Sequence, residues 1–464
     1  MKKVAFHNLG CKVNSYEMEG ILHLFQKRDY EIVDFAQKSD IYIINTCTVT
    51  NIADRKSRQM IHRARALNPK AVVVAAGCYV QTHPEEAVKD ECVDIVVGNN
   101  HKSEIVDIVE EYLNRRACCK EFIDEPNYEN SVKTLEGKTV SDLTKPVLYE
   151  NLRIYSISEH TRAFIKIQDG CNQFCSYCAI PFARGRVRSR DAGEIIDEVK
   201  ALANSGCREV VLTGIHLSSY GLNESYNSFA AKQETNEALL EVIERVSEIK
   251  EIERVRLGSL EPRLITEEFV KRLYKIEKIC PHFHISLQSG SDTVLGRMNR
   301  HYTVDEYERS VILLRKYFEH PAITTDVIAG FPGETQEEAA QTRNFLEKIN
   351  LYECHVFKYS RRAGTIADKM KEQLTDKVKQ ERSSRLIADS LLRKNDYVKY
   401  YVGRSVTVLI EESILIEGKK YYRGFTPEYV ECYCTGDFDE SICGRLVKCR
   451  GLSVRDGILY ADAD

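Results

Sequence analysis

Short apolar runs that alternate with helical patterns account for most of this chain. In the first hundred residues, strand-like runs end at residues 11, 47 and 78, helical patterns follow the first two, and a fourth run covers 94–99. A second series starts at residue 163 and continues at 209–215, 254–259, 282–287, 323–328 and 354–360. The first series predicts a parallel sheet. The second predicts a barrel or partial barrel of roughly six β/α units, with its active site at the carboxyl ends of the strands.

We therefore expect an α/β protein with several folded parts. A chain of 464 residues fits two to four domains of about 150 residues each. Its last segment contains short strands without helices, a pattern typical of OB-like barrels. The predicted parts are an N-terminal parallel-sheet α/β domain at 1–113, a polar linker at 114–160, a partial (β/α)6 barrel at 161–374, a helical connector at 375–400 and an all-β domain at 401–464.

Composition excludes several classes of protein. The chain is 43% hydrophobic and 29% charged, as globular proteins are, and it contains no run of about 18 apolar residues that could cross a membrane. Its N-terminus is a strand pattern broken by polar residues rather than a signal peptide, so we expect a cytoplasmic protein. In that reducing compartment, the 16 cysteines indicate metal ligands and ordinary buried thiols rather than disulfides. The net charge of −4 argues against a uniformly basic nucleic-acid binder.

Three cysteines on one short loop carry the strongest chemical signal. Cys171, Cys175 and Cys178 lie in the run GCNQFCSYC, directly after the first strand of the second series. We call them the loop triad. Three thiolates on one loop suit a [4Fe-4S] cluster with one open iron, which can bind the amino and carboxylate groups of S-adenosylmethionine (SAM). The alternative is a zinc site, but the spacing fits neither common zinc pattern.

Three further cysteines each follow a predicted strand of the N-terminal sheet. Cys11, Cys47 and Cys78 form what we call the strand-end triad. The carboxyl ends of strands in an open α/β sheet converge on the crevice where ligands bind, so these thiols can meet at one site. This favours a second metal or iron–sulfur site. The alternative is three independently buried cysteines.

The motifs together resemble the methylthiotransferase family of radical SAM enzymes, and the resemblance covers essentially the whole chain. The N-terminal motifs are NLGCKVN, INTCTVT and AGC, which contain the strand-end triad. The later ones are KIQDGCN, ARGRVRSR, SLEP, LQSGSD and DVIAGFPGET. The runs LGCKVNSYE, NTCTVTNIADRKSRQMIHRA, IQDGCNQFCSYCAIPFARG and TGIHLSSYG resemble the branch that modifies N6-threonylcarbamoyladenosine.

This resemblance implies an enzyme that inserts sulfur and a methyl group at C2 of N6-threonylcarbamoyladenosine, at position 37 beside the tRNA anticodon. It implies two [4Fe-4S] clusters, each with an open iron. The cluster on the loop triad would reduce SAM to a radical that removes the C2 hydrogen, and the cluster on the strand-end triad would hold the sulfur. SAM would serve both as radical source and as methyl donor. The last segment would be a TRAM domain, and the partners would be the tRNA anticodon loop, a reductive electron donor such as flavodoxin or ferredoxin, and a sulfur donor.

The resemblance also assigns the remaining site residues. The RNA contacts would come from three arginines of the run ARGRVRSR, whose alternation places at least two on one face of an extended segment. The alternative for these arginines is ion pairing with Asp191, Glu194 and their neighbours. The expected SAM-binding residues are Thr213, Gly214, Ser259, Glu261, Gln288, Ser289 and Asp326, and the expected RNA-binding residues are Arg184, Arg186 and Arg188.

Other functions fit the sequence less well. A cobalamin-dependent radical SAM methyltransferase needs a D-x-H-x-x-G loop for the cobalt ligand, and the sequence contains none. A protein that merely docks tRNA has no use for two open clusters. Within the family, the alternatives are methylthiolation of isopentenyladenosine in tRNA or of a ribosomal-protein aspartate. Four cysteines of the acidic last segment are expected to be ordinary thiols rather than zinc ligands, namely Cys432, Cys434, Cys443 and Cys449.

Overall fold

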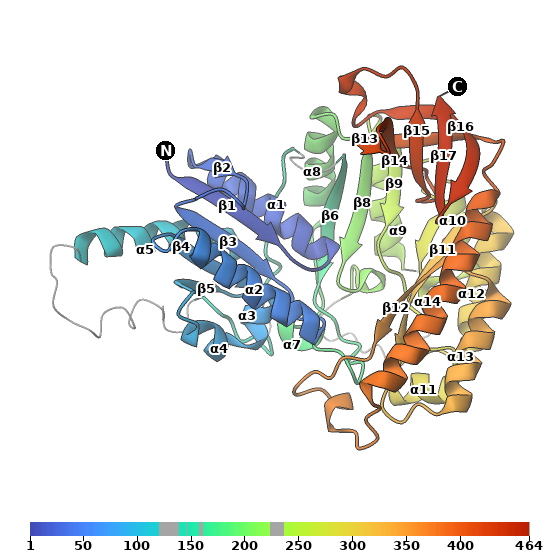
Figure 1. Cartoon of the computed structure of the whole chain (residues 1–464), viewed down its shortest axis with the longest axis horizontal. Helices are drawn as coiled ribbons and strands as arrows, with labels where there is room; N and C mark the ends of the chain where they lie inside the picture. Colours follow the sequence, from blue (N-terminus) through green and yellow to red (C-terminus); the bar gives the residue numbers. More distant parts are fainter. Residues whose placement is uncertain (120–138, 146, 157–160, 223–235, 464) are drawn as a thin grey trace.

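The computed structural model describes residues 1–119, 139–145, 147–156, 161–222 and 236–463. It contains a parallel α/β sheet, a partial barrel and a closed β-barrel, which confirms the predicted fold class (Figure 1). About half of the predicted linker at 114–160 lies outside the described residues, and its first residues continue a helix that reaches Cys119. No helix in the described ranges is both long and apolar enough to span a membrane.

The N-terminal sheet has five parallel strands in the order β2-β1-β3-β4-β5. The two central strands β3 and β4 are buried along their whole length, because helices cover both faces of the sheet. The strands are β1 (Lys3–Asn8), β2 (Glu31–Val33), β3 (Ile41–Thr46), β4 (Val72–Gly77) and β5 (Ile95–Val97). The helices are α1 (Lys12–Gln26), α2 (Asn51–Leu67), α3 (Cys78–Thr82), α4 (Pro84–Lys89), η1 (Lys102–Glu104) and α5 (Ile105–Cys119).

The partial barrel is built from six parallel strands. Strands β6, β8 and β9 pair in parallel, as do β10, β11 and β12, and single bridges at Val255–Ile279 and Leu260–Ile285 join the two groups. A short antiparallel strand, β7, borders β6. The strands are β6 (Arg162–Asp169), β7 (Arg188–Ser189), β8 (Glu209–Gly214), β9 (Arg254–Leu257), β10 (His282–His284), β11 (Ala322–Ala329) and β12 (Glu353–Lys358).

Side-chain caps begin most of the longer barrel helices. The hydroxyls of Thr303 and Thr335 each accept a hydrogen bond from the backbone N–H three residues on. The carboxylate of the glutamate at that position accepts the backbone N–H of the cap residue in return. The longer helices are α8 (Ala192–Asn204), α9 (Glu237–Ser247), α10 (Glu267–Tyr274), α12 (Val304–Tyr317), α13 (Gln336–Ile349) and α14 (Asp376–Lys399). The short ones are α7 (Ile180–Arg184), η2 (Leu217–Ser219), η3 (Pro262–Leu264), α11 (Asp292–Arg297) and η4 (Ala367–Lys369).

The last segment forms a closed barrel, β13-β14-β15-β17-β16. Arginines from the amino ends of barrel strands fasten it: Arg254 donates to the carbonyls of Phe425 and Thr407, and Arg256 to that of Pro427. Both arginines also pair with the buried carboxylate of Glu209. The elements are β13 (Ser405–Ile416), β14 (Lys419–Phe425), β15 (Glu431–Thr435), η5 (Glu440–Ile442), β16 (Leu446–Arg455) and β17 (Ile458–Ala463).

Helix α1 joins the N-terminal sheet to the partial barrel. It packs on β1 of its own sheet and on β6 of the barrel, between the blue and green parts of Figure 1. Tyr16 on α1 belongs to the barrel's hydrophobic core, and its hydroxyl donates to the carbonyl of Leu152. The carboxyl ends of β1 and β6, which carry the two cysteine motifs, are therefore held in one assembly.

Candidate active site at the strand ends

The loop triad leaves β6 through a turn that only glycine can make. Gly170 has φ +72°, and a Cβ placed on it would lie 1.8 Å from the carbonyl oxygen of Arg186. The next residue, Cys171, donates its N–H to the carbonyl of Gly185 at 3.0 Å. Two further backbone bonds fasten Ser176, to Met298 and Ala367, so both sides of the cysteine loop are held by the barrel.

Two of the loop-triad sulfurs accept hydrogen bonds of the kind that stabilise a thiolate. The backbone N–H of Gln173 donates to Sγ of Cys171 at 3.4 Å, and Nη1 of Arg300 donates to Sγ of Cys175 at 3.2 Å. The other arm of Arg300 pairs with Glu261 at 2.5 Å. Burial, followed by the neighbouring Cys175, raises the pKa of Cys178 to about 12, so ligation must displace its proton.

The strand-end triad also gathers at one place. Cys11 is the N-cap of α1, Cys47 follows β3, and Cys78 begins α3 directly after β4. Burial raises the pKa of Cys47 to about 11, and the proximity of Cys78 and Cys11 adds to this rise. Cys78 accepts a hydrogen bond from Nδ2 of Asn99 at 3.4 Å. Two glycines with positive φ, Gly10 at +114° and Gly77 at +99°, precede Cys11 and Cys78.

The spacing of both triads differs from that of a single-ion site. Zn–S bonds of about 2.3 Å in tetrahedral geometry hold two sulfurs about 3.8 Å apart. In the described part of the chain, only His62, Asp90 and Cys92 bring three ligand atoms within 4.8 Å of one another. Neither triad is that compact. Together with the N–H···S bonds, this spacing fits a larger, multi-iron group at each triad.

A buried network of charges lies between the two triads. Glu17 on α1 pairs with Lys102, Lys166 and Arg184, and Asp169 pairs with Lys166 at 3.0 Å and Arg184 at 3.5 Å. Burial raises the pKa of Glu17, but the charges of Arg184, Lys102 and Lys166 outweigh it and hold that pKa well below its usual range. Asp169 precedes Cys171 by two residues, and Arg184 donates to Asn14, three residues after Cys11, at 2.5 Å.

Cations outnumber carboxylates in this network. Arg188 joins it through Asp169 at 3.3 Å, so four cations surround Glu17 and Asp169. Among the described atoms, the Nε of Arg184 and all three guanidinium nitrogens of Arg188 are buried without a hydrogen-bond acceptor. A cluster held by three thiolates is anionic, and buried positive charge of this kind would complement it.

The expectation that Arg184, Arg186 and Arg188 bind RNA is wrong for two of the three. Arg184 is 0% exposed and Arg188 is 6% exposed. Each forms an ion pair with a buried carboxylate, Arg184 with Glu17 and Arg188 with Asp169. Arg190 is buried as well and pairs with Glu198 and, at 3.6 Å, with Glu194, so the ion-pairing alternative applies to it. Arg186 alone is exposed, and its guanidinium lies over the ring of Phe174, 4.5 Å from its centre.

The expected SAM-binding residues lie at or beyond the carboxyl ends of β8 to β10 and within β11, but they differ in what their side chains contact. Glu261 pairs with Arg300 and with Nε2 of His216 at 3.5 Å. Burial raises the pKa of Glu261, but Arg300 and His216 outweigh it and bring the pKa to about 2. Thr213 is buried at the end of β8, beside Gly214, and Ser259 is exposed beyond β9.

The expected SAM-binding residues beyond β10 and in β11 also differ in what their side chains contact. Gln288 has φ +69° and donates its N–H to the carbonyl of Asp326 at 2.9 Å, while the carboxylate of Asp326 lies 3.4 Å from Nε2 of His284. Ser289 is 1% exposed, and its hydroxyl is bonded to that of Thr342 on α13 at 3.2 Å. Its side chain is therefore turned toward the helix layer.

Sequence reasoning missed Arg300 and His216. Both contact Glu261, and Arg300 also reaches the loop triad, although 122 residues separate it from Cys178 in the chain. Arg300 follows α11 in the run MNRHY, which has no metal-ligand or nucleotide pattern of its own. Two indirect signals existed: the SLEP motif contains Glu261, and the run TGIHLSSYG contains His216.

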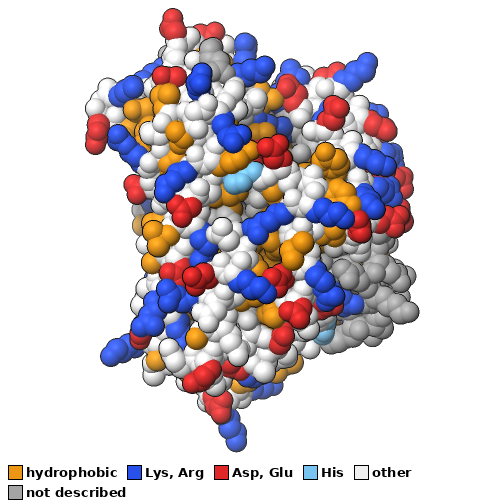
Figure 2. Space-filling model, turned by 90° about the vertical axis from the view of Figure 1, so that its right-hand side faces the viewer, with side chains coloured by type: hydrophobic (Ala, Val, Ile, Leu, Met, Phe, Trp, Pro, Cys, Tyr) orange, Lys and Arg blue, Asp and Glu red, His pale blue; other side chains and the backbone are white. Residues whose placement is uncertain are grey.

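The cysteines of the last segment do not form a compact ligand group among the described residues. Cys432, Cys434 and Cys449 are fully buried in the hydrophobic core of the closed barrel, and Cys443 is exposed. The surface in Figure 2 carries Lys and Arg side chains interspersed with Asp and Glu, as the small net charge suggests.

Known proteins similar to this chain share both triad-bearing regions. Residues 165–346 match the Radical SAM superfamily, and residues 3–98 match the Uncharacterized protein family UPF0004. Threonylcarbamoyladenosine tRNA methylthiotransferase MtaB of Bacillus subtilis (strain 168) is 41% identical over 449 residues, covering 97% of this chain and 93% of that protein. The protein of the same name from Aquifex aeolicus (strain VF5) is 41% identical, covering 89% and 94%.

More distant relatives bear other names. A tRNA-2-methylthio-N(6)-dimethylallyladenosine synthase of Clostridium novyi (strain NT) is 33% identical, covering 88% of this chain and 86% of that protein. Among solved structures, the radical S-adenosylmethionine methyltransferase TsrM from Kitasatospora setae has a TM-score of 0.53 at 17% identity, covering 79% of this chain and 74% of its own. That likeness shows a shared fold.

Proposed function

The chain belongs to the methylthiotransferase family of radical SAM enzymes, and we propose that it converts N6-threonylcarbamoyladenosine beside the tRNA anticodon into its 2-methylthio derivative. The observation that carries this function is the identity of 41%, over 97% and 89% of the chain, to two enzymes named for that reaction. Both cysteine triads lie within the regions that match the two family models. The enzyme uses SAM and [4Fe-4S] clusters, as its family does. We further propose that it works in the cytoplasm, where its tRNA substrate is found.

The proposed cluster ligands are the two triads. Cys171, Cys175 and Cys178 would hold one cluster and Cys11, Cys47 and Cys78 the other. When bound, the clusters and SAM supply the one-electron chemistry and the sulfur that an unactivated aromatic carbon requires. The donors of the electron and of the sulfur would be separate partners, a reductive protein of the flavodoxin or ferredoxin kind and a sulfur carrier.

The chain's own residues would position these groups and tune their charge. Arg300 is held by Glu261 and donates to Cys175, so it supports negative charge on the loop-triad sulfur. Lys102, Lys166, Arg184 and Arg188 are all buried and place positive charge between the triads. We propose that Thr213, Gly214, Gln288 and Asp326 line the SAM site with Ser259. Glu261 would act through Arg300, and Ser289 would support the strand end from behind.

We propose that the tRNA contact near the active site comes from Arg186 rather than from the whole arginine run. Its exposed guanidinium, stacked on Phe174 beside the loop triad, could bind a phosphate or stack on an unpaired base. Bases in single-stranded loops can leave their stack and be read on their edges, so the modified adenine could enter the barrel mouth.

The substrate can be tested by offering the reconstituted enzyme three substrates in parallel. These are tRNA bearing the threonylcarbamoyl group, tRNA bearing the isopentenyl group, and the ribosomal protein. Mass spectrometry of the digested products should show methylthiolation of the first alone. Methylthiolation confined to either of the other two would refute the proposed substrate, and it would leave the radical chemistry intact.

A further inference from the structure

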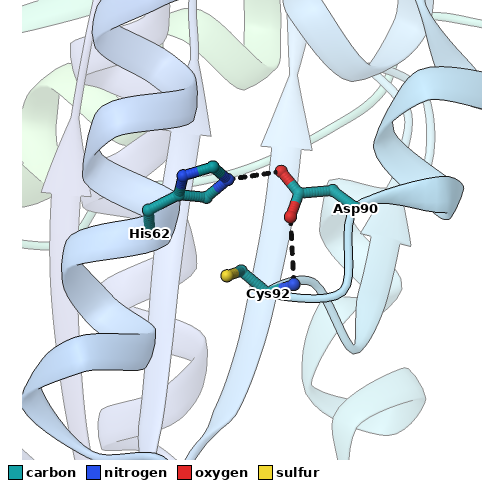
Figure 3. Close-up of side chains that lie close together, drawn as sticks. All are labelled: His62, Asp90 and Cys92. Atoms are coloured by element: carbon teal, nitrogen blue, oxygen red, sulfur yellow. Dashed lines mark hydrogen bonds and ion pairs between the residues drawn. The ribbon is translucent and has the colours of Figure 1, made fainter.

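A second kind of ligand cluster lies on the N-terminal domain, outside both triads. His62 is on α2, Asp90 is the C-cap residue directly after α4, and Cys92 lies in the loop between α4 and β5 (Figure 3). One ligand atom from each lies within 4.8 Å of the other two, and Nε2 of His62 is 2.8 Å from Oδ2 of Asp90. His62 follows Asn51, the first residue of α2, by 11 positions, or roughly 16 Å along the helix, so the cluster is remote from Cys47.

The loop that carries two of these residues is held firmly in place. Oδ1 of Asp90 accepts the N–H of Cys92 at 2.9 Å, which leaves Oδ2 facing His62. Nη2 of Arg65, one turn after His62 on α2, donates to the carbonyl of Cys92 at 3.2 Å and to Asp94 at 2.5 Å. Asp94 also accepts the N–H of Val73 on β4 at 2.7 Å. Hydrogen bonds to α2 and to β4 therefore hold the loop in the position that brings the three ligand atoms together.

We propose that His62, Asp90 and Cys92 form a binding site for a divalent transition-metal cation of the zinc class. One imidazole nitrogen, one carboxylate oxygen and one thiolate are the ligand types that zinc accepts, and three protein ligands leave a fourth position for water. Binding replaces the S–H bond of Cys92 by a metal–sulfur bond and breaks the hydrogen bond between His62 and Asp90. The thiol proton passes to solvent, and the imidazole proton stays on the ring nitrogen that does not bind the metal, without change of oxidation state. Arg65 is a cation beside Cys92, and its pairing with Asp94 at 2.5 Å offsets its charge.

A metal here would brace the helix that supports the strand-end triad. Ser57 on α2 accepts the N–H of Cys47 and donates to its carbonyl, both at 3.2 Å. Asp54 on the same helix pairs with Arg362 of the partial barrel at 2.6 Å. Fixing the other end of α2 to the α4–β5 loop would restrict its movement relative to β4 and β5. Bracing α2 is therefore the role that we assign to the site, although a position left to water distinguishes it from the closed, four-ligand zinc sites of most structural zinc proteins.

The test is metal analysis of the holoenzyme with both clusters loaded, after incubation with zinc and removal of the free ion. We expect one zinc per chain in addition to iron. His62→Ala and Cys92→Ser should weaken zinc binding by more than about tenfold, since even partners one step removed from a ligand cost that much. Cys443→Ser, which removes an exposed thiol elsewhere, should retain zinc as the wild type does. Iron content equal to that of the wild type shows that each variant is folded.

X-ray absorption at the zinc edge adds an independent measurement. One sulfur ligand with nitrogen and oxygen ligands is expected in the wild type. Zinc bound through several sulfurs, zinc retained in both the His62→Ala and Cys92→Ser variants, or a wild-type holoenzyme that binds no zinc would each overturn the proposal. These outcomes do not depend on the methylthiolation reaction.

Discussion

The guanidinium of Arg300 lies 3.2 Å from Sγ of Cys175 and donates a hydrogen bond to it through Nη1. Nη2 of the same side chain is fixed by Glu261, so a carboxylate beyond β9 orients a donor toward the loop triad. Hydrogen bonds to cluster sulfurs help to set reduction potentials. This contact therefore connects a strand-end residue of the barrel to the redox properties expected of the loop.

Replacing Arg300 by Gln should make the loop-triad cluster harder to reduce. The variant loses a charged donor to sulfur, so its midpoint potential should fall and SAM cleavage should slow by about ten- to a hundredfold. Arg309→Gln, an exposed arginine on α12, is the matched control and should match the wild type. Redox titration monitored by electron paramagnetic resonance measures the potential. An unchanged potential in Arg300→Gln would contradict this role.

The two triads should hold separate clusters. Anaerobically reconstituted wild type is expected to bind about eight irons per chain, and the triple Ala variant of either triad about four. The loop-triad variant should lose reductive SAM cleavage, whereas the strand-end variant should retain it. Iron analysis with a SAM-cleavage assay checks both points, and a wild type that never exceeds four irons would refute the two-cluster assignment.

Two arginines two positions apart should behave differently. Arg186→Gln should weaken tRNA binding. The slope of log K for tRNA binding against log salt concentration should fall by about one, as expected for one lost phosphate contact, and SAM cleavage should be nearly unchanged. Arg184→Gln should instead lower iron retention, because it removes buried charge beside Glu17 and Asn14. Filter binding at several salt concentrations and iron analysis distinguish the two. Loss of tRNA binding at full iron content in Arg184→Gln would contradict its structural role.

Glu209 should make stability depend on pH at the junction with the closed barrel. Burial raises its pKa, but Arg256, Arg162 and Arg254 outweigh it and lower the pKa from 4.5 to about 2. Because the folded pKa is depressed, the stabilisation is present above about pH 4.5 and is lost as the pH falls toward 2. Glu209→Gln should cost about 3–5 kcal/mol at neutral pH, since Arg254 and Arg256 lose the carboxylate that they pair with and Arg162 keeps only Glu411.

Thermal unfolding of the cluster-free protein measures this effect without interference from acid-labile iron. The wild type should lose stability between pH 4.5 and 2, and Glu209→Gln should show a flatter profile over that range. Glu251→Gln, an exposed glutamate before β9, is the control and should follow the wild-type profile. Parallel profiles for Glu209→Gln and the wild type would refute the assignment.

Much of the fold could be predicted because strand and helix periodicity are local properties of the sequence. The runs at 209–215 and 323–328 correspond closely to β8 and β11, and the segment 375–400 corresponds to α14. Short elements such as β2 were missed, because three residues carry too little periodicity to recognise. The end of the first predicted domain was placed at residue 113, although helix α5 continues to Cys119.

The sequence by itself determined which cysteines stand at strand ends, because parallel strands bring their carboxyl ends to one edge whatever the loops contain. Only the tertiary structure decided the partners of the charged side chains. Alternating arginines after Cys178 indicated an exposed basic strip, yet α1 brings Glu17 onto Arg184 across more than 160 residues of chain. The same long-range folding places Arg300 on Cys175 and His62 beside Cys92. Ion pairs and ligand groups of this kind depend on which surfaces are packed together, and no local periodicity encodes that.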